Sequence, residues 1–168
     1  IGKSVVLKSA INDFANNDRA WLVGECSPIT QLSPFGLIQN VLLTFFNVPT
    51  FCVDSLQLKK DSQKFFQTEF PTLTNDEIFN LLNFLYPKNT SYYENIFINK
   101  DRTLIFLEKI FRTIIENNKT VFIIENFDYI DGLSYEFIHH LAGSNLMDKQ
   151  LKLLLTYTQK RPVQGYIY

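Results

Sequence analysis

The chain opens with residue types that bind phosphate. The order is Ile1-Gly2-Lys3-Ser4, and a helical pattern follows directly. These residues match the end of the phosphate-binding loop GxxxxGK[ST]. In that loop glycine lets backbone N–H groups face phosphate oxygens, lysine neutralises phosphate charge, and the serine hydroxyl coordinates Mg²⁺. We expect the chain to begin inside such a loop, with its first glycine and preceding strand missing; an ordinary helix start is the alternative.

A second polar group lies far along the chain, in VFIIENFDYID. The apolar run ends at Glu125, and Asn126, Asp128 and Asp131 follow. In parallel α/β sheets, ligands bind at the carboxyl ends of the strands. A phosphate-binding enzyme needs a carboxylate there for Mg²⁺ and another group to orient the attacking water. Glu125 is placed for this role. The alternative is that Glu125 only ends a strand and that Asp131-Gly132 forms a turn.

Hydrophobic periodicity places these groups on alternating strands and helices. We predict buried strands at 20–26, 120–128 and 151–157, with the second buried on both faces. The predicted helices span 3–16, 34–47, 54–68, 74–86, 101–117 and 133–142. This alternation indicates an α/β fold with a parallel sheet in three α/β/α layers.

Three helix starts carry an N-cap residue type. Ser33 precedes Pro34, Asp101 opens the helix over 101–117, and Thr74 is followed three residues later by Glu77. Serine, threonine and aspartate accept hydrogen bonds from free N–H groups at a helix start. The pair of Thr74 and Glu77 also predicts a reciprocal capping box.

Composition bounds the class of protein. The chain has 168 residues, a net charge of -1 and 46% hydrophobic residues. That length and apolar content predict one domain with a core. The nearly neutral charge offers no electrostatic reason to bind nucleic acid or an anionic membrane, and the apolar runs are too short to span one. Cys26 and Cys52 are expected to be reduced thiols, with a disulfide as the alternative.

Three stretches, in this order, resemble the STAND class of AAA-like signalling ATPases, and more closely the AAA-type domain of bacterial multidomain regulators. GKSVVLKSAINDF resembles the phosphate-binding loop and its helix. WLVGECSPITQLSPFGLIQNVL resembles the second strand, its Cys-to-Pro-aromatic loop and the next helix. VFIIENFDYIDGLSYEFIHHL with LKLLLTYTQKRP resembles the Walker B segment and the sensor strand. The resemblance implies a P-loop NTPase-like fold for residues 1–168, partial because the first strand and the lid are absent.

The resemblance also implies ligands and roles. ATP and Mg²⁺ would be bound by Gly2, Lys3, Ser4, Val5 and Thr156. Ser4 and Glu125 would hold the metal ion, while Glu125 and Asn126 would be the catalytic positions.

Two residues depart from the family pattern. Asn126 stands where an aspartate is usual, and Thr158 where an arginine is usual. An amide cannot take up a proton as a carboxylate can, and threonine offers no charge to a phosphate. Arg161 lies three residues beyond Thr158 as a substitute. We therefore expect nucleotide binding with slow hydrolysis, and no hydrolysis by these residues alone.

Several functions fit this pattern. The first is an ATP-driven switch in a cytoplasmic signalling protein, with nucleotide, other domains of the same chain, and protein partners or further copies as its partners. The second is a degenerate, non-hydrolysing scaffold for protein–protein interaction. A P-loop kinase ranks last, since its few arginines are scattered. His139-His140 is expected to be one half-exposed and one packed residue, with a metal-binding or catalytic role as the alternative. The aromatic residues over 65–97 are expected to belong to the core, with a protein-docking surface as the alternative.

Overall fold

The computed structural model describes residues 9, 19–47, 56–87, 99–116, 119–144 and 151–157. They form an α/β unit around a three-stranded parallel sheet of order β1-β2-β3. The strands are β1 (Arg19–Glu25), β2 (Lys119–Glu125) and β3 (Leu151–Leu155). The α-helices are α2 (Gly36–Phe45), α3 (Leu56–Glu69), α4 (Asn75–Leu85), α6 (Lys100–Glu116) and α7 (Gly132–Ala142).

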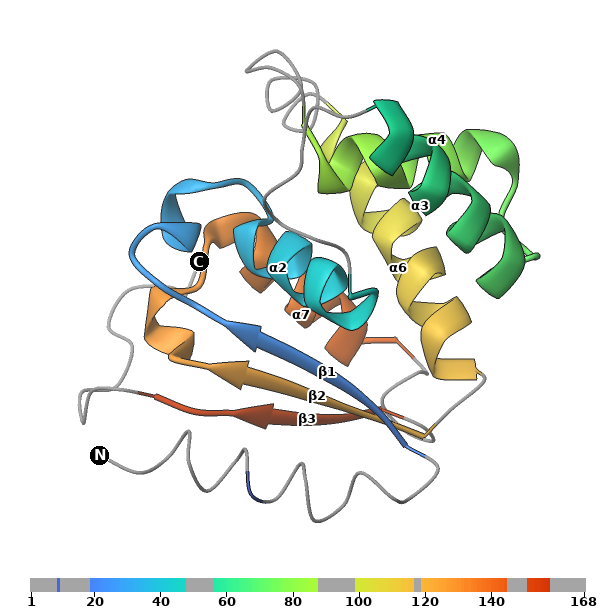
Figure 1. Ribbon diagram of the computed structural model, residues 1–168. Coiled ribbons are helices and arrows are strands. Elements are labelled where there is room, and N and C mark those ends of the chain that lie inside the picture. Colours follow the sequence, from blue (N-terminus) through green and yellow to red (C-terminus); the bar gives the residue numbers. More distant parts are fainter. Residues whose placement is uncertain are drawn as a thin grey trace.

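One face of the sheet carries the helical layer. In Figure 1, α2 and α7 lie over this face, and α3, α4 and α6 lie beside them. The predicted parallel α/β arrangement is confirmed for these elements. The helix predicted over 3–16 lies outside the described residues, so the further layer of the predicted three-layer fold stays a prediction.

The middle strand is buried because its sequence is apolar on both faces. Phe122 is 0%, Ile123 1% and Ile124 0% exposed, as expected of a central parallel strand. The last strand differs from its prediction. Leu151 is buried, but Lys152 is exposed and Leu154 keeps 44% of its surface exposed. β3 is therefore not buried along both faces, although its apolar run resembles that of β2.

Close packing of α2 against β1 depends on Gly24. A Cβ atom at this position would lie 2.4 Å from Val41 Cγ2 and 2.6 Å from Leu37 Cδ1. Both distances are far inside van der Waals contact, so a larger residue would force the side chains of Val41 and Leu37 to move.

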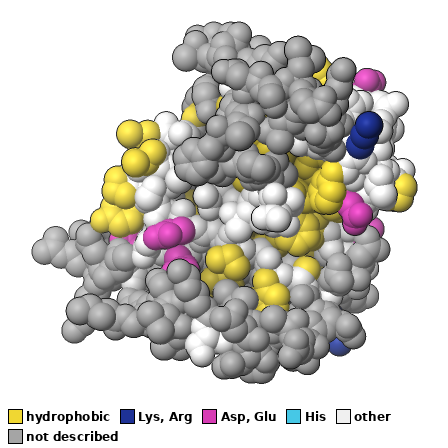
Figure 2. Space-filling view, viewed as in Figure 1, with side chains coloured by type: hydrophobic (Ala, Val, Ile, Leu, Met, Phe, Trp, Pro, Cys, Tyr) yellow, Lys and Arg dark blue, Asp and Glu magenta, His cyan; other side chains and the backbone are white. Residues whose placement is uncertain are grey.

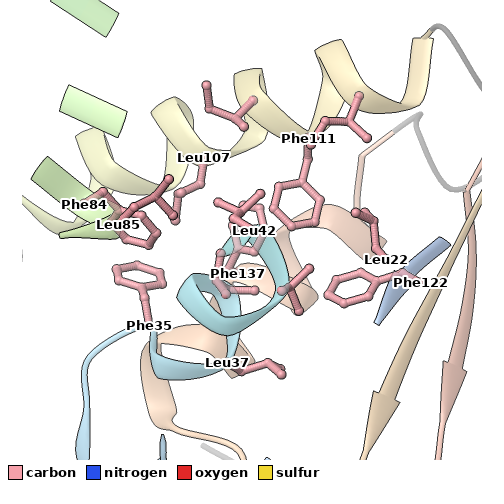
Figure 3. Close-up of a cluster of buried hydrophobic side chains, with 14 of the residues drawn as sticks. Leu22, Phe35, Leu37, Leu42, Phe84, Leu85, Leu107, Phe111, Phe122 and Phe137 are labelled. Carbon is pink, nitrogen blue, oxygen red and sulfur yellow. The ribbon is translucent and has the colours of Figure 1, made fainter. Parts of the chain in front are cut away.

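An aromatic cluster joins the sheet to α6 and α7. The ring centroid of Phe111 lies 5.6 Å from that of Phe122 and 5.0 Å from that of Phe137. Figure 3 shows these rings with Leu22 and Leu42, so that one core receives side chains from β1, β2, α2, α6 and α7. Burial of such large rings supplies much of the hydrophobic stabilisation that holds the helices on the sheet.

The aromatic residues of α3 and α4 divide between core and surface. Phe66 and Phe84 are buried, with the ring centroid of Phe66 4.7 Å from that of Phe46. Phe65 and Phe79, by contrast, are 40% and 64% exposed. The prediction that these aromatics belong to the core is therefore right for Phe66 and Phe84 and wrong for Phe65 and Phe79. Residues 88–98 lie outside the described part of the chain.

Ion pairs connect the helices at their surfaces. Lys109 of α6 pairs with Glu77 of α4, and Lys100 of α6 lies 2.9 Å from Glu136 of α7. Exposed pairs of this kind each contribute at most about 1 kcal/mol. The buried side chains of α6 therefore hold the helix in place more than these pairs do.

The N-cap predictions have three outcomes. Thr74 forms the predicted capping box with Glu77. Asp101 lies inside the first turn of α6, which already begins at Lys100, so its predicted role as N-cap is wrong. Ser33 is not the cap of α2 either: α2 begins at Gly36 after Phe35, which has left-handed backbone angles of φ 55° and ψ 27° and no side-chain cap bond.

Candidate functional site

The carboxyl ends of the three strands bring together residues that are distant in sequence. Glu25 ends β1 and is the register partner of Glu125, which ends β2. Thr156 follows β3, and its N–H donates to the carbonyl of Ile124 at 2.9 Å. Glu125 is 8% exposed, whereas Glu25 is exposed. The predicted site residues Glu125 and Thr156 therefore lie at the same edge of the sheet.

Asn126 connects all three strand ends. It has left-handed backbone angles of φ 56° and ψ 45°, which asparagine tolerates better than most residues. Its N–H donates to Thr156 Oγ1 at 3.4 Å, and its Nδ2 donates to Glu25 Oε1 at 3.2 Å. The next N–H, of Phe127, donates to the carbonyl of Thr156 at 2.8 Å. The backbone at this catalytic candidate is thus held by β3 and its side chain by β1.

Asp131 has a structural role at this edge. Its Oδ1 accepts from Ser134 N–H at 2.9 Å, which makes it the N-cap of α7. The same carboxylate accepts from Phe35 N–H at 3.0 Å and Leu37 N–H at 3.2 Å, at the start of α2. Asp131 is 3% exposed. It therefore positions the loop before α2 against the segment after β2. Its carboxylate oxygens accept three backbone hydrogen bonds in this role.

Negative charge is concentrated around Cys26. Burial, followed by the nearby carboxylates of Asp131 and Asp128, raises the pKa of this thiol from 9.0 to about 12. Glu25 acts in the same direction with a smaller effect. Cys26 is free and buried, as predicted, and is a neutral thiol at ordinary pH; Cys52 lies outside the described residues. Acidic side chains are visible at the left of Figure 2, beside exposed apolar ones, at the end where the strands finish in Figure 1.

The chemistry of this edge fits Mg²⁺ in the way that nucleotide sites use it. Across the described ranges, no group of three or more His, Cys, Asp or Glu side chains is arranged to hold a metal ion. Mg²⁺ at phosphate sites, however, is held by one or two carboxylates together with waters and phosphate oxygens. A single buried carboxylate at a strand end, such as Glu125, fits that coordination.

The other half of the predicted site cannot be placed against this edge. Gly2, Lys3, Ser4 and Val5 lie outside the described residues, as do Thr158 and Arg161. What the structure brings together is the group from the strand ends: Glu125, Asn126 and Thr156.

Sequence reasoning missed Glu25. It lies one residue before Cys26, inside a stretch that was correctly predicted as a strand. The available signal was its position at the carboxyl end of that strand, where side chains face a ligand edge. Its pairing with Asn126, however, depends on the β1–β2 register, which the sequence does not display.

The histidine pair has no role at this edge. His140 is half-buried, and its Nε2 lies 2.7 Å from Glu108 Oε2, so that this contact joins α7 to α6. The hydrogen bond to His140, with a smaller effect from Arg112, lowers the pKa of Glu108. His139 is exposed. The expected pattern of one half-exposed and one packed histidine is therefore only partly correct.

A cavity of about 270 Å³ lies near the same edge, between the loop over 31–34 and the start of α7. Its buried carboxylate, Asp131, is already bonded to backbone N–H groups. This carboxylate therefore serves the fold at the cavity wall.

Comparison of the chain with protein-family models, with curated proteins and with solved structures finds no match. In the part of the chain that the structure describes, no helix has the length and apolar character needed to cross a bilayer.

Proposed function

We propose that this chain is a nucleotide-binding domain that holds ATP with Mg²⁺ and acts as a switch within a larger signalling protein. One observation carries the proposal. The buried carboxylate of Glu125 lies at the carboxyl end of the central parallel strand, beside Asn126 and Thr156. That edge is where α/β sheets bind ligands. The Gly2-Lys3-Ser4 run supplies residue types that bind phosphate.

The proposed roles follow from residue chemistry. Gly2, Lys3 and Val5 would contact phosphate through backbone N–H groups and the lysine ammonium, while Ser4 and Glu125 would hold Mg²⁺. When bound, Mg²⁺ would supply positive charge to the phosphate oxygens. Thr156 keeps the backbone of Asn126 beside this group through its hydroxyl.

Hydrolysis is proposed to be slow. Asn126 occupies the position at which a carboxylate would accept a proton, and an amide has no such capacity at neutral pH. ATP would then remain bound for a long time, which suits a switch whose state is set by the bound nucleotide.

The test is ATP binding by a protein that contains the complete phosphate-binding loop, measured by calorimetry with and without Mg²⁺. Lys3→Ala should weaken binding by at least about tenfold, since it removes a charge-assisted phosphate contact. Glu125→Gln should reduce the gain in affinity that Mg²⁺ provides. Lys119→Ala is the matched control, because Lys119 is an exposed lysine at the opposite end of β2. Absence of saturable binding, or equal binding by Lys3→Ala, would refute the proposal.

A second proposal is a non-hydrolysing scaffold that contacts other proteins. Asn126 in place of an acid favours it, and so do Ile29 and Leu32, which are 79% and 85% exposed on the loop after β1. Exposed side chains of this size are common at protein contacts. ATP binding without turnover would favour the scaffold. Turnover that disappears in Glu125→Gln would count against it.

A further inference from the structure

Asn126 can assist hydrolysis only in one orientation of its side-chain amide. An amide carbonyl can accept a hydrogen bond from the attacking water and so orient it, as glutamine does in other phosphoryl-transfer sites. The NH₂ end of the same amide can only donate and cannot accept this bond. The two ends are nearly equal in size, so packing alone selects poorly between them.

The backbone of Asn126 is already fixed by β3. Its N–H donates to Thr156 Oγ1, and the following N–H donates to the carbonyl of Thr156. The remaining freedom is the orientation of the side chain. On that side lies Glu25, which is the register partner of Glu125 on the neighbouring strand.

Glu25 selects between the two amide orientations. Asn126 Nδ2 lies 3.2 Å from Glu25 Oε1. An ionised carboxylate accepts hydrogen bonds and donates none, so Asn126 must present its NH₂ to it. Oδ1 is thereby turned away from Glu25 and left available to another donor. A flipped amide would place two acceptor oxygens against each other.

We propose that Glu25 is a positioning residue for the nucleotide site: it holds the amide of Asn126 so that Oδ1 is the group offered to the attacking water. This inference rests on the proposed function. It gives a role to the pair of Glu25 and Asn126, which joins the ends of β1 and β2. In this pair, Asn126 is an amide at the position where the resemblance leads one to expect an acid.

The experiment combines a spectroscopic and a kinetic readout on a protein with the complete phosphate-binding loop. The side-chain amide signals of Asn126 in a ¹H–¹⁵N spectrum report the hydrogen bond without nucleotide. They should shift in Glu25→Ala and shift less in Glu25→Gln, whose carbonyl can still accept but whose NH₂ can also donate to Oδ1. In ATP hydrolysis, Glu25→Ala should lower kcat about twofold with KM unchanged, because an amide without a preferred orientation offers Oδ1 to the water about half of the time.

The Asn126→Asp background separates positioning from a general structural role. A carboxylate presents two equivalent oxygens, so no orientation needs to be selected. Glu25→Ala should therefore lower kcat about twofold when Asn126 is present, but should not lower it in the Asn126→Asp background, where it removes a carboxylate that repels the new one. Unchanged amide signals, an equal loss in both backgrounds, or ATP binding without hydrolysis would overturn the role of Glu25 alone. Loss of ATP binding altogether would overturn the proposed function and this role with it.

Discussion

The N-termini of α4 and α2 present the same free N–H groups and satisfy them differently. At α4, Thr74 Oγ1 accepts from Glu77 N–H at 3.3 Å, and Glu77 Oε2 accepts from Thr74 N–H at 2.9 Å. At α2, the acceptor for Phe35 and Leu37 is Asp131, which lies 96 and 94 residues away in sequence. The first cap is exposed and local, and the second is buried and long-range.

The two caps therefore have different consequences: the cap of α4 stabilises one helix, whereas Asp131 also positions the candidate site. Loss of the α4 cap would affect the end of one surface helix. Loss of Asp131 would release the loop before α2 and the start of α7 together, both of which adjoin the strand ends with Glu125 and Asn126. The buried cap therefore couples the fold to the candidate site, and the exposed one does not.

The largest effect is expected for Asp131→Ala. It leaves three N–H groups without their acceptor, two of them at the start of α2. The free energy of unfolding should fall by about 3–5 kcal/mol, measured by urea denaturation. Asp131→Asn should lie between wild type and alanine, because it keeps one acceptor oxygen but places NH₂ toward a donor. A loss below about 1 kcal/mol for alanine would contradict the coupling role.

Two glycines at the same helical position sharpen the comparison. A Cβ at Gly36, the first residue of α2, would lie 2.4 Å from the carbonyl oxygen of Thr30, whereas one at Gly132, the first residue of α7, meets nothing within 4 Å. Gly36→Ala should therefore cost about 1–3 kcal/mol by overpacking. Gly132→Ala should be neutral or stabilise by up to about 1 kcal/mol. Equal thermal shifts for the two variants would show that the start of α2 is not confined by its loop.

A smaller effect is expected at the local cap. Thr74→Ala removes the acceptor for Glu77 N–H and should cost about 1 kcal/mol in urea unfolding. Thr68→Ala is the matched control, since Thr68 is an exposed helical threonine whose hydroxyl only donates to the Lys64 carbonyl of its own helix. If both variants lose the same stability, the capping box contributes nothing specific.

The smallest effect concerns the charge of Glu77. The hydrogen bond from Lys109, followed by that from Thr74 N–H, lowers the pKa of Glu77 from 4.5. A lowered pKa in the folded state stabilises the protein above the unfolded pKa, and this contribution disappears as pH falls through the folded value. Because the pair is largely exposed, solvent screening reduces it to a few tenths of a kcal/mol.

Glu77→Gln tests this charge contribution, because glutamine can still complete the capping box. Wild type should be slightly more stable than Glu77→Gln at neutral pH, and the difference should shrink as pH falls below the ordinary pKa of glutamate and vanish below the lowered pKa of the folded state. A difference that persists in acid would assign the effect to side-chain packing instead.

Local patterns predicted most elements of the fold. The strand predicted over 120–128 and the helix predicted over 133–142 could be identified because their apolar spacing is a property of neighbouring residues. The strand ends at Glu125, earlier than predicted, because Asn126 has left-handed backbone angles and a 3-10 turn follows over Phe127–Tyr129. Thr74 and Glu77 were identified for the same reason. Ser33 and Asp101 were wrong as caps because the residue type permits capping, but the backbone enters the helix elsewhere.

The candidate site was predicted less completely. Glu125 was predicted at the sheet edge from its position at a strand end, whereas Thr156 was named only because the resemblance implies it; the structure has both at the same edge. Glu25 was not identified, although its strand was, because its relation to Asn126 requires the parallel register of β1 with β2. Residues 1–8 lie outside the described part of the chain, so convergence of Lys3 with Glu125 stays a prediction.

The amino-acid sequence by itself determined the alternation of strands and helices, the apolar middle strand and the capping box at α4. Each of these depends on side chains within a few residues of one another, where spacing along the chain equals proximity in space. Tertiary structure alone decided that Asp131 caps α2 and that Glu25 meets Asn126. Both contacts join segments about a hundred residues apart, and only the parallel pairing of the strands brings them within hydrogen-bonding distance.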